Sequence, residues 1–415
     1  MKNNIKKNIR ALLNVEDVKY LVKNSRFKLI YRIILFVGNF FITFCFANFT
    51  STIFYGRYLF ITSVIAFTYF LSFAGFNEAL LQSTASGYDH FLITALKKKF
   101  YYSLIGSLSL VIFAIFYSIL FEENLIIFLS LTIGAIFFPF DSAAYLNFFF
   151  LDGKGKFKKE LAFRLIYFSL RILFLLLLIF VIKNLIIYFL ILYGIQSILN
   201  VIFTKSCIKM IENKKKIIEL DIKSSKYGIF LTKYGIISII TINVNSIIIG
   251  LFFGADALAV YTIGIGLITT IISLLTPSFS VLITRYSQKR TKLSKKFLFF
   301  LLFGSIILFI CINLTLPFYF KILFPNYYNS LSYGIAYSFI ILIYPLEVIL
   351  GSYFRGKTEK KVIKYGSLIP DVCYLILLYP LLLIFGIYGF IVADFLKSFI
   401  RLIIYLLNFK SIEFN

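Results

Sequence analysis

Two arginines stand seven residues apart in a run of the sequence that is otherwise mostly apolar. Arg164 and Arg171 both belong to the run 161–182, and Arg171 is ten residues into it. A charge at the centre of a membrane costs about 2.5–3.5 kcal/mol on insertion scales, so a deep arginine needs a reason. Guanidinium groups pair well with phosphate oxygens. The spacing predicts a cationic track suited to a pyrophosphate; the alternatives are an ion pair for Arg171 and snorkelling for Arg164.

A second group of charges repeats at helical spacing near the end of the chain. Asp394, Lys397 and Arg401 stand at i, i+3 and i+7 in the run 387–409. Lys397 and Arg401 are predicted to line a central cavity, unless Asp394 and Lys397 neutralise each other on one helix face. Asp394 is also a candidate for ion coupling. Arg32 and Lys233 lie within a turn or two of a span end, where each is predicted to snorkel or to mark the cavity mouth.

Two acids each follow a proline by two residues in corresponding apolar runs. Pro139 precedes Asp141, and Pro345 precedes Glu347. A proline inside a helix removes one backbone N–H and frees a carbonyl, which predicts a polar kink. Asp141 and Glu347 are therefore expected either to gate the cavity or carry a coupling cation, or to pair with the deep basic residues.

Three asparagines and two more acids lie within the apolar runs. Asn39, Asn243 and Asn245 either bind substrate hydroxyls or join neighbouring helices by hydrogen bonds, and packing is the favoured role. Glu78 and Asp371 are close to run ends. The pair Pro370–Asp371 predicts a helix start, where the acid would serve as a cap.

Metal and triad chemistry has few candidate residues in this chain. His90 is the single histidine, and the four cysteines lie in apolar or basic segments where no disulfide is expected. Glu122–Glu123 occupies a three-residue turn and is interpreted as a solvated helix end. The sequence predicts no cofactor, no metal and no catalytic residue, and leaves H⁺ or Na⁺ as candidate coupling ions.

The composition excludes a soluble protein. Of the 415 residues, 60% are hydrophobic and 15% charged, the mean hydropathy is +0.92 and the formal charge is +25. Soluble proteins average about 45–50% apolar and about 25% charged residues. The abundance of Lys, Ile, Phe and Asn is also typical of an AT-rich genome. A polytopic α-helical membrane protein is predicted.

Twelve apolar runs are long enough to cross a membrane as helices. They lie at 29–50, 58–82, 100–121, 125–151, 161–182, 185–204, 228–253, 257–283, 297–320, 331–354, 367–385 and 387–409. This predicts an all-α fold with two six-helix lobes, 29–204 and 228–409, joined by a basic linker, 205–227. Residues 1–28 are predicted to form an amphipathic helix on the inner membrane face or a partly ordered basic tail, and 410–415 a short cytoplasmic tail.

The basic residues alternate between loops in a way that fixes the topology. Thirty-four of the 43 Lys and Arg residues fall in residues 1–28, the tail and the loops after every second span, against three (Arg57, Lys183 and Lys321) on the other side. The positive-inside rule then places both termini in the cytoplasm. The basic loops are expected to attract anionic membrane lipids. Nucleic-acid binding is disfavoured because no folded basic domain is present.

The two halves of the chain resemble each other at an offset of about 200 residues. Asn39 corresponds to Asn243, Pro139–Asp141 to Pro345–Glu347, and Gly153–Lys154 to Gly356–Lys357. Six spans per half give both halves the same orientation, related by an axis along the membrane normal. The repeat predicts an alternating-access transporter with a substrate cavity between its lobes.

Several short motifs resemble the Wzx-type polysaccharide flippases. They are Leu21–Ser25, Phe54–Tyr58, Phe73–Asn77 with Leu80–Gln82, and Leu323–Tyr328, in which Pro325 replaces the usual glycine. These flippases belong to the multidrug/oligosaccharidyl-lipid/polysaccharide (MOP) exporter superfamily with a MATE-like fold. The resemblance implies movement of undecaprenyl-pyrophosphate-linked repeat units, of O-antigen or capsule type, from the inner to the outer leaflet. It also implies an inner-membrane location and glycan polymerase and glycosyltransferases as pathway partners.

Three rival functions are weighed against this interpretation. Cation-coupled drug exporters of the superfamily usually need an acid in the first or seventh span, where this chain has Arg32 and Lys233. A membrane enzyme such as a glycan polymerase needs a sizeable outer loop, and the longest one predicted here is about ten residues. A peptidoglycan-precursor flippase is only weakly disfavoured, because such proteins usually carry extra spans.

Overall fold

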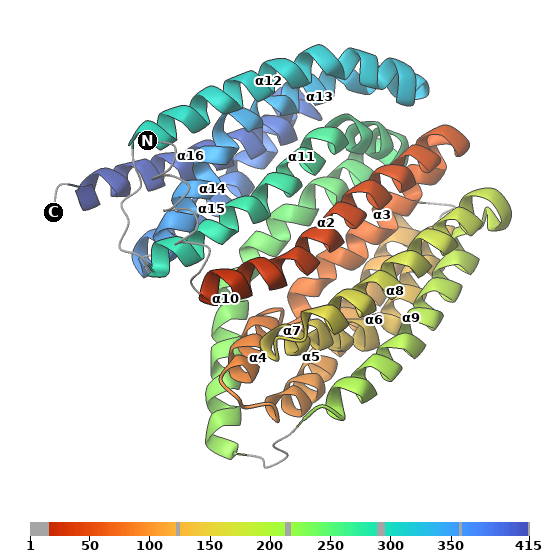
Figure 1. The fold of residues 1–415 in the computed structure, drawn as a ribbon. Helices are drawn as coiled ribbons and strands as arrows, with labels where there is room; N and C mark the ends of the chain where they lie inside the picture. The colour runs from red at the N-terminus through yellow and green to blue at the C-terminus, as the bar shows by residue number, and fades with distance from the viewer. Residues whose placement is uncertain (1–15, 122–124, 212–216, 289–294, 357–358, 414–415) are drawn as a thin grey trace. The chain divides into compact units, whose positions relative to one another are not determined.

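The computed structural model describes residues 16–121, 125–211, 217–288, 295–356 and 359–413 (Figure 1). Within these ranges the chain forms helices and contains no strand, which confirms the predicted all-α fold. Two interpretations lie outside the described residues: the Glu122–Glu123 turn and the amphipathic character of 1–28, whose side chains are not described.

In chain order the elements are α2 (Glu16–Phe49), α3 (Thr52–Thr68), η1 (Tyr69–Ser72), α4 (Gly75–Ala85), α5 (Phe91–Leu120), α6 (Leu125–Ala144), α7 (Leu146–Gly153), α8 (Phe157–Leu177), η2 (Leu178–Ile182), α9 (Leu185–Ile208), α10 (Ile218–Ile248), η3 (Ile249–Phe253), α11 (Gly254–Gln288), α12 (Lys295–Leu323), η4 (Pro325–Ser330), α13 (Leu331–Ser338), α14 (Ile340–Gly356), α15 (Lys360–Phe385) and α16 (Tyr388–Glu413).

Nine helical segments of the described chain are long and apolar enough to cross a membrane, or ten if one bent pair is a single span. Each of these segments overlaps at least one of the twelve predicted runs. Predicted runs seven and eight both overlap one apolar helical segment, Gly235–Ser273. Within it Gly254 has φ +89°, a left-handed conformation that suits glycine and separates η3 from α11. The last run forms α16, whose charged residues keep it below the apolarity that marks the other spans.

Helices α6 and α14 continue through the two prolines at which kinks are predicted. Helix α6 continues through Pro139 and ends at Ala144, so the break falls at Tyr145, beyond the proline. Helix α14 likewise contains Pro345, and a 43° bend lies before it, between Ser338 and Ile340. A proline in a helix removes one hydrogen bond without fixing where the chain bends, since neighbouring groups can compensate.

Packing divides the chain into two compact units that are not consecutive halves. Unit 1 comprises Met1–Ile42, Leu71–Phe113 and Thr132–Thr232; unit 2 comprises Thr43–Phe70, Ala114–Leu131 and Lys233–Asn415. The lobes 29–204 and 228–409 describe a sequence repeat and remain a prediction.

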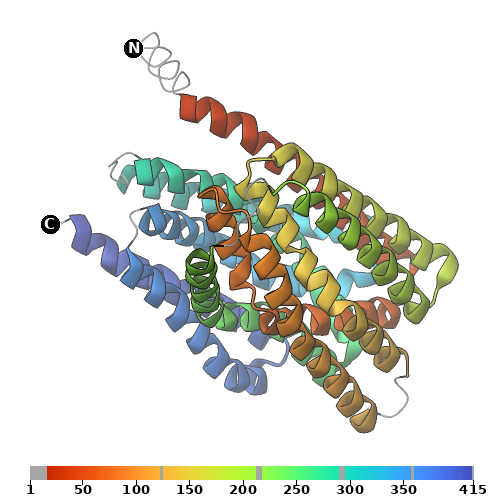
Figure 2. The same ribbon diagram turned by 90° about the horizontal axis from the view of Figure 1, so that it is seen from below.

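Aromatic stacking dominates the interior of unit 1. Helices α8 and α9 lie side by side (Figures 1 and 2), and Phe163 of α8 stacks on Phe203 of α9 with ring centroids 3.8 Å apart. Phe73 stacks on Tyr102 of α5 at the same distance. Aromatic pairs of this kind add about 0.5–1.5 kcal/mol each beyond the burial of their area.

The interior of unit 2 is built around the last three helices. Helices α15 and α16 lie side by side (Figure 1), and α14 packs on α16. Tyr353 and Phe354 of α14 contact Phe409 and Tyr405 of α16, with ring centroids 5.5 and 5.6 Å apart. This packing fixes the positions from which the charged side chains of α14, α15 and α16 project.

Also in unit 2, α3 packs against α11 at Gly56. A Cβ atom at this position would lie 1.7 Å from the carbonyl oxygen of Ala255, so the two backbones approach too closely for any side chain. Gly56→Ala is therefore expected to lower the free energy of unfolding by about 1–3 kcal/mol. Thermal unfolding of the purified protein in detergent measures the effect.

Gly266 provides the matched control for this substitution. It also lies in a helix, α11, and a Cβ atom added there would meet nothing within 4 Å. Gly266→Ala should leave stability unchanged or raise it slightly, because alanine is the better helix former. Equal unfolding midpoints for the two variants would contradict the close approach at Gly56.

Candidate functional site in the polar networks of the membrane-spanning helices

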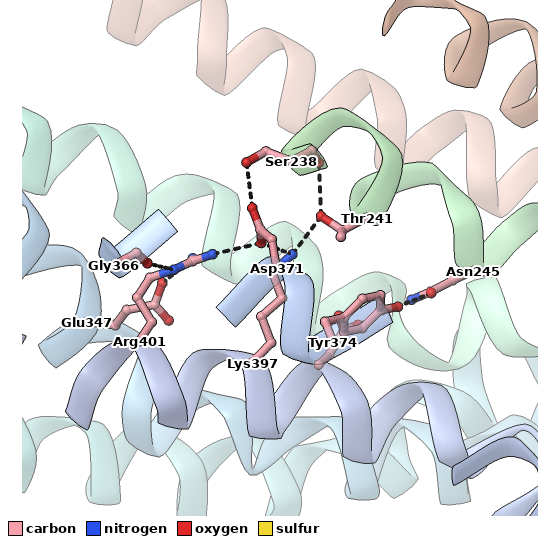
Figure 3. A network of polar contacts seen from close by, with 10 residues as sticks. Ser238, Thr241, Asn245, Glu347, Gly366, Asp371, Tyr374, Lys397 and Arg401 are labelled. Atoms are coloured by element: carbon pink, nitrogen blue, oxygen red, sulfur yellow. Dashed lines mark hydrogen bonds and ion pairs between the residues drawn. The ribbon is translucent and has the colours of Figure 1, made fainter. Parts of the chain in front are cut away.

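A buried carboxylate on α15 is the centre of a polar network in unit 2 (Figure 3). Asp371 is 1% exposed. Its Oδ2 accepts a hydrogen bond from the Ser238 hydroxyl at 2.6 Å, and its Oδ1 lies 2.9 Å from Lys397 Nζ and 3.2 Å from Arg401 Nη2. The two basic residues on α16 thus share one acid from the neighbouring helix.

Arg401 joins this acid to a second one. Its Nη1 donates to Glu347 Oε1 of α14 at 2.7 Å, and its Nε donates to the carbonyl of Gly366 at 3.0 Å. Glu347 is buried, and its Oε2 has no hydrogen-bond partner among the described residues. The guanidinium group therefore bridges α14 and α15 from α16.

Lys397 connects the network to α10. Its Nζ donates to the Thr241 hydroxyl at 2.9 Å and lies 5.1 Å from the centre of the Tyr374 ring. The Tyr374 hydroxyl donates to Asn245 Oδ1, and Asn245 Nδ2 donates to Asp394 Oδ2 at 3.5 Å. Asn245 thus joins neighbouring helices, which was its favoured role.

This network corrects two expectations about its acids. Pro370–Asp371 does not start a helix, because α15 runs unbroken from Lys360 to Phe385 and Asp371 lies in its interior. The ammonium group of Lys397 binds Asp371 rather than Asp394 on its own helix. The structure brings Lys397, Arg401, Glu347 and Asp394 together as one cluster. Asp371 was missed as a site residue, although a lone acid in an apolar run is itself a signal that a partner exists.

In unit 1 Arg164 is held by an acid and two rings. Its Nε donates to Glu160 Oε1 at 2.6 Å, one turn earlier on α8. The guanidinium carbon lies 4.3 Å from the centre of the Phe148 ring and 5.3 Å from that of Tyr31. Contacts of this kind favour a structural role for Arg164. Arg171, two turns further along α8, has an exposed side chain in unit 1.

The acid after Pro139 also lies in a polar environment. Asp141 is half-buried and accepts a hydrogen bond from Asn200 Nδ2 at 3.4 Å. Lys99, whose ammonium group interacts electrostatically with Asp141, is 1% exposed and donates to Asn77 Oδ1 at 2.7 Å. Lys99 is one of the basic residues in the loop after the second predicted span; the structure buries it while Lys97 is exposed.

Polar contacts also fix the start of α10 in unit 1. The Tyr88 hydroxyl and the Thr94 hydroxyl donate to the two carboxylate oxygens of Asp221, at 2.8 and 2.7 Å. Burial raises the pKa of Tyr88 and keeps its hydroxyl a donor. His90 Nδ1 lies 4.0 Å from Asp221, and Lys98 donates to Ser225 at 2.8 Å. These contacts hold the first turns of α10 to unit 1.

Within the part of the chain that the structure describes, the remaining candidates make no contact that assigns a binding role. Arg32, Lys233 and Asn39 have exposed side chains. Asn243 is half-buried and donates to the Ile239 carbonyl of its own helix at 3.1 Å. Glu78 lies in the first turn of α4, where an acid interacts favourably with the helix dipole as expected.

Comparison with known proteins adds a family to this architecture. A family model described as "Polysaccharide biosynthesis protein" matches residues 47–309, more than half of the chain. The chain belongs to this family. No curated protein matches the chain.

Solved structures show the same fold. The lipid II flippase MurJ in an inward closed conformation matches with a TM-score of 0.68 and 17% identity, covering 94% of this chain and 87% of that one. An outward-facing MATE family multidrug transporter of the MOP superfamily matches with a TM-score of 0.61 and 13% identity over 95% of both chains. A MOP superfamily transporter from Pyrococcus furiosus gives 0.61 and 12%, covering 95% and 96%. Together with the family match, they confirm the predicted resemblance to Wzx-type members of the MOP superfamily.

The motifs that carried this resemblance occupy structural contacts. Within Phe54–Tyr58, Gly56 lies at the point where the backbone of α3 closely approaches that of α11. In Phe73–Asn77 the last residue accepts from buried Lys99. In Leu323–Tyr328 the first carbonyl accepts from Asn48 Nδ2 at 3.0 Å, and the aromatic rings include Phe324 and Tyr327, which are buried. The motifs of this polysaccharide-biosynthesis protein thus describe its fold more than its substrate.

Proposed function

We propose that this protein is a flippase that moves an undecaprenyl-pyrophosphate-linked oligosaccharide, of O-antigen or capsule type, from the inner to the outer leaflet of the cytoplasmic membrane. The observation that supports it is the family match over residues 47–309 on a chain with the MOP transporter fold. A lipid-linked oligosaccharide is both a membrane lipid and a glycan. It therefore suits a multi-pass membrane protein of a polysaccharide-biosynthesis family. The chain makes or breaks no bond in this proposal.

Arg171 is our candidate for contact with the pyrophosphate. It lies ten residues into the apolar run 161–182, where a charge is costly and needs a reason. Arg171 is the deep arginine whose side chain is exposed, and a guanidinium group suits two adjacent phosphate groups. Asn39 and Asn243 remain candidates for sugar hydroxyls.

The setting of the proposed reaction follows from the charges in the loops. The positive-inside bias supports cytoplasmic termini and an inner-membrane location. The substrate would come from glycosyltransferases on the cytoplasmic side and pass to a glycan polymerase on the other. Transport would proceed by alternating access of the two six-helix lobes.

A gene-deletion strain tests this function. Without the protein, the lipid-linked oligosaccharide is expected to accumulate in the inner leaflet and surface glycan to disappear, and a plasmid copy should restore both. Labelling of the sugar from the periplasmic side of spheroplasts reports which leaflet holds it. Normal labelling in the deletion strain would contradict the proposal.

A second candidate is a flippase for the peptidoglycan precursor, favoured by the TM-score of 0.68 to a lipid II flippase over 94% of this chain. The two functions differ in the glycan that they accept. A strain depleted of its own lipid II flippase should grow when it expresses this chain only if the second candidate is correct.

A further inference from the structure

The ammonium group of Lys397 has the surroundings of a bound monovalent cation. Its Nζ lies 2.9 Å from Asp371 Oδ1, 2.9 Å from Thr241 Oγ1 and 5.1 Å from the centre of the Tyr374 ring (Figure 3). These groups project from α10 and α15, and Lys397 reaches them from α16. A carboxylate oxygen, a hydroxyl oxygen and an aromatic face each attract any cation placed among them.

Helix α10 supplies a row of polar groups along this position. Ser238, Thr241 and Asn245 stand at i, i+3 and i+7, so they share one face of the helix. The Ser238 hydroxyl donates to Asp371 Oδ2, and the Asn245 amide donates to Asp394 Oδ2. Hydroxyl, amide and carboxylate groups are the oxygen donors that hard cations prefer.

The charges of the network favour a cation at this position. Glu347, Asp371 and Asp394 carry three formal negative charges against the two positive charges of Lys397 and Arg401. Loss of the lysine charge would leave an excess of two negative charges, with Glu347 5% and Asp371 1% exposed. Uncompensated buried charge is strongly destabilising.

We propose that the junction of α10, α15 and α16 is a monovalent-cation site that the protein fills with its own Lys397 ammonium group. An ammonium group is close in size to a potassium ion, and both are satisfied by neutral and anionic oxygen atoms. Because the lysine is part of the chain, this cation does not exchange with the solution. The native site therefore needs neither Na⁺ nor K⁺.

The inference goes beyond the proposed flippase function and has one consequence for it. If the protein is a flippase, the ion that drives it is not a metal cation bound at Asp371 and Thr241. The site itself can be tested without any transport measurement.

The substitution Lys397→Met removes the ammonium group and leaves the cation position free for an ion from solution. Methionine keeps an unbranched chain on α16 but carries no charge, so Thr241 loses its cation and Asp371 keeps Arg401 as its cationic partner. We expect this variant, purified as the full chain in detergent, to unfold at a lower temperature than wild type in choline chloride. NaCl or KCl at equal ionic strength should raise its unfolding midpoint saturably, whereas wild type should unfold at the same temperature in all three salts.

Two further variants separate the cation from the rest of the site. Lys397→Arg keeps the charge and should show no dependence on Na⁺ or K⁺. The double variant Asp371→Asn/Lys397→Met loses one acid with the base, so it should fold in choline chloride without a response to either metal. Lys98→Met, which removes an ammonium group bound to the Ser225 hydroxyl in unit 1, is the control for losing a lysine elsewhere.

Three results would overturn the inference. One is a Lys397→Met variant with the same midpoint in choline and sodium or potassium salts. Another is a saturable gain for wild type with Na⁺ or K⁺, which would mean an exchangeable site. The third is a Lys397→Met variant that fails to fold in NaCl and KCl while the double variant folds. None of these readouts depends on whether the protein moves a lipid-linked glycan.

Discussion

Asp371→Ala is expected to lower the free energy of unfolding by about 3 kcal/mol and to abolish glycan export. The substitution leaves Lys397 and Arg401, whose side chains are 15% and 22% exposed, without the carboxylate that they share. It also leaves the Ser238 hydroxyl without its acceptor. Removing one member of a buried ionic cluster is costly because the remaining charges stay buried. Thermal unfolding in detergent and a complementation assay for surface glycan measure the two effects.

Asp394→Ala is the matched control for this prediction. Asp394 is an acid of the same network, but it is half-buried and its carboxylate accepts a long hydrogen bond of 3.5 Å from Asn245. Its loss is expected to cost about 1 kcal/mol or less. If Asp394→Ala proved more damaging than Asp371→Ala, the centre of the network would have been assigned to the wrong acid.

Arg171→Ala is expected to reduce glycan export by about 10- to 100-fold. Hydrogen bonds to charged groups contribute about 1.5–3 kcal/mol, which corresponds to this range in affinity. Arg171→Lys should retain part of the export, because an ammonium group keeps the charge but loses the two-pronged geometry of the guanidinium group. Complementation of the deletion strain, with protein levels checked in the membrane fraction, gives the measurement.

Arg32→Ala provides the comparison, since Arg32 is also an exposed arginine in an apolar run but lies near its end. It should export glycan at close to the wild-type level. Normal export by Arg171→Ala would remove Arg171 from the substrate site. A lowered unfolding midpoint together with lost export would instead assign it a structural role.

The fold could be read from the sequence to a large extent because long apolar helices have a strong one-dimensional signal. The run 185–204 corresponds to α9, Leu185–Ile208, and the run 297–320 to α12, Lys295–Leu323. Where the sequence reading was wrong, the signal was a local motif. Pro370 predicts a helix start, although α15 continues through it. Neighbouring groups can compensate the hydrogen bond that a proline removes, and a two-residue motif does not specify those groups.

The network of unit 2 could be predicted only in part. Lys397, Arg401, Glu347 and Asp394 were all recognised as charges that need partners, because the membrane makes each of them costly. Which groups pair depends on distances across helices: Arg401 contacts Glu347, 54 positions away in the sequence. By contrast, the contact of Glu160 with Arg164 spans four residues and could have been predicted from helical spacing alone.

Reconstitution of the purified protein into vesicles tests the proposed function most directly. A pyrophosphate-linked polyprenyl oligosaccharide with a fluorescent sugar is placed in both leaflets, and a quencher that cannot cross the membrane is added outside. Vesicles with wild-type protein are expected to lose nearly all fluorescence with time, whereas empty vesicles should keep the inner-leaflet half. Vesicles with Arg171→Ala should lose that half about 10- to 100-fold more slowly than wild type. Equal quenching in wild-type and empty vesicles would contradict the account.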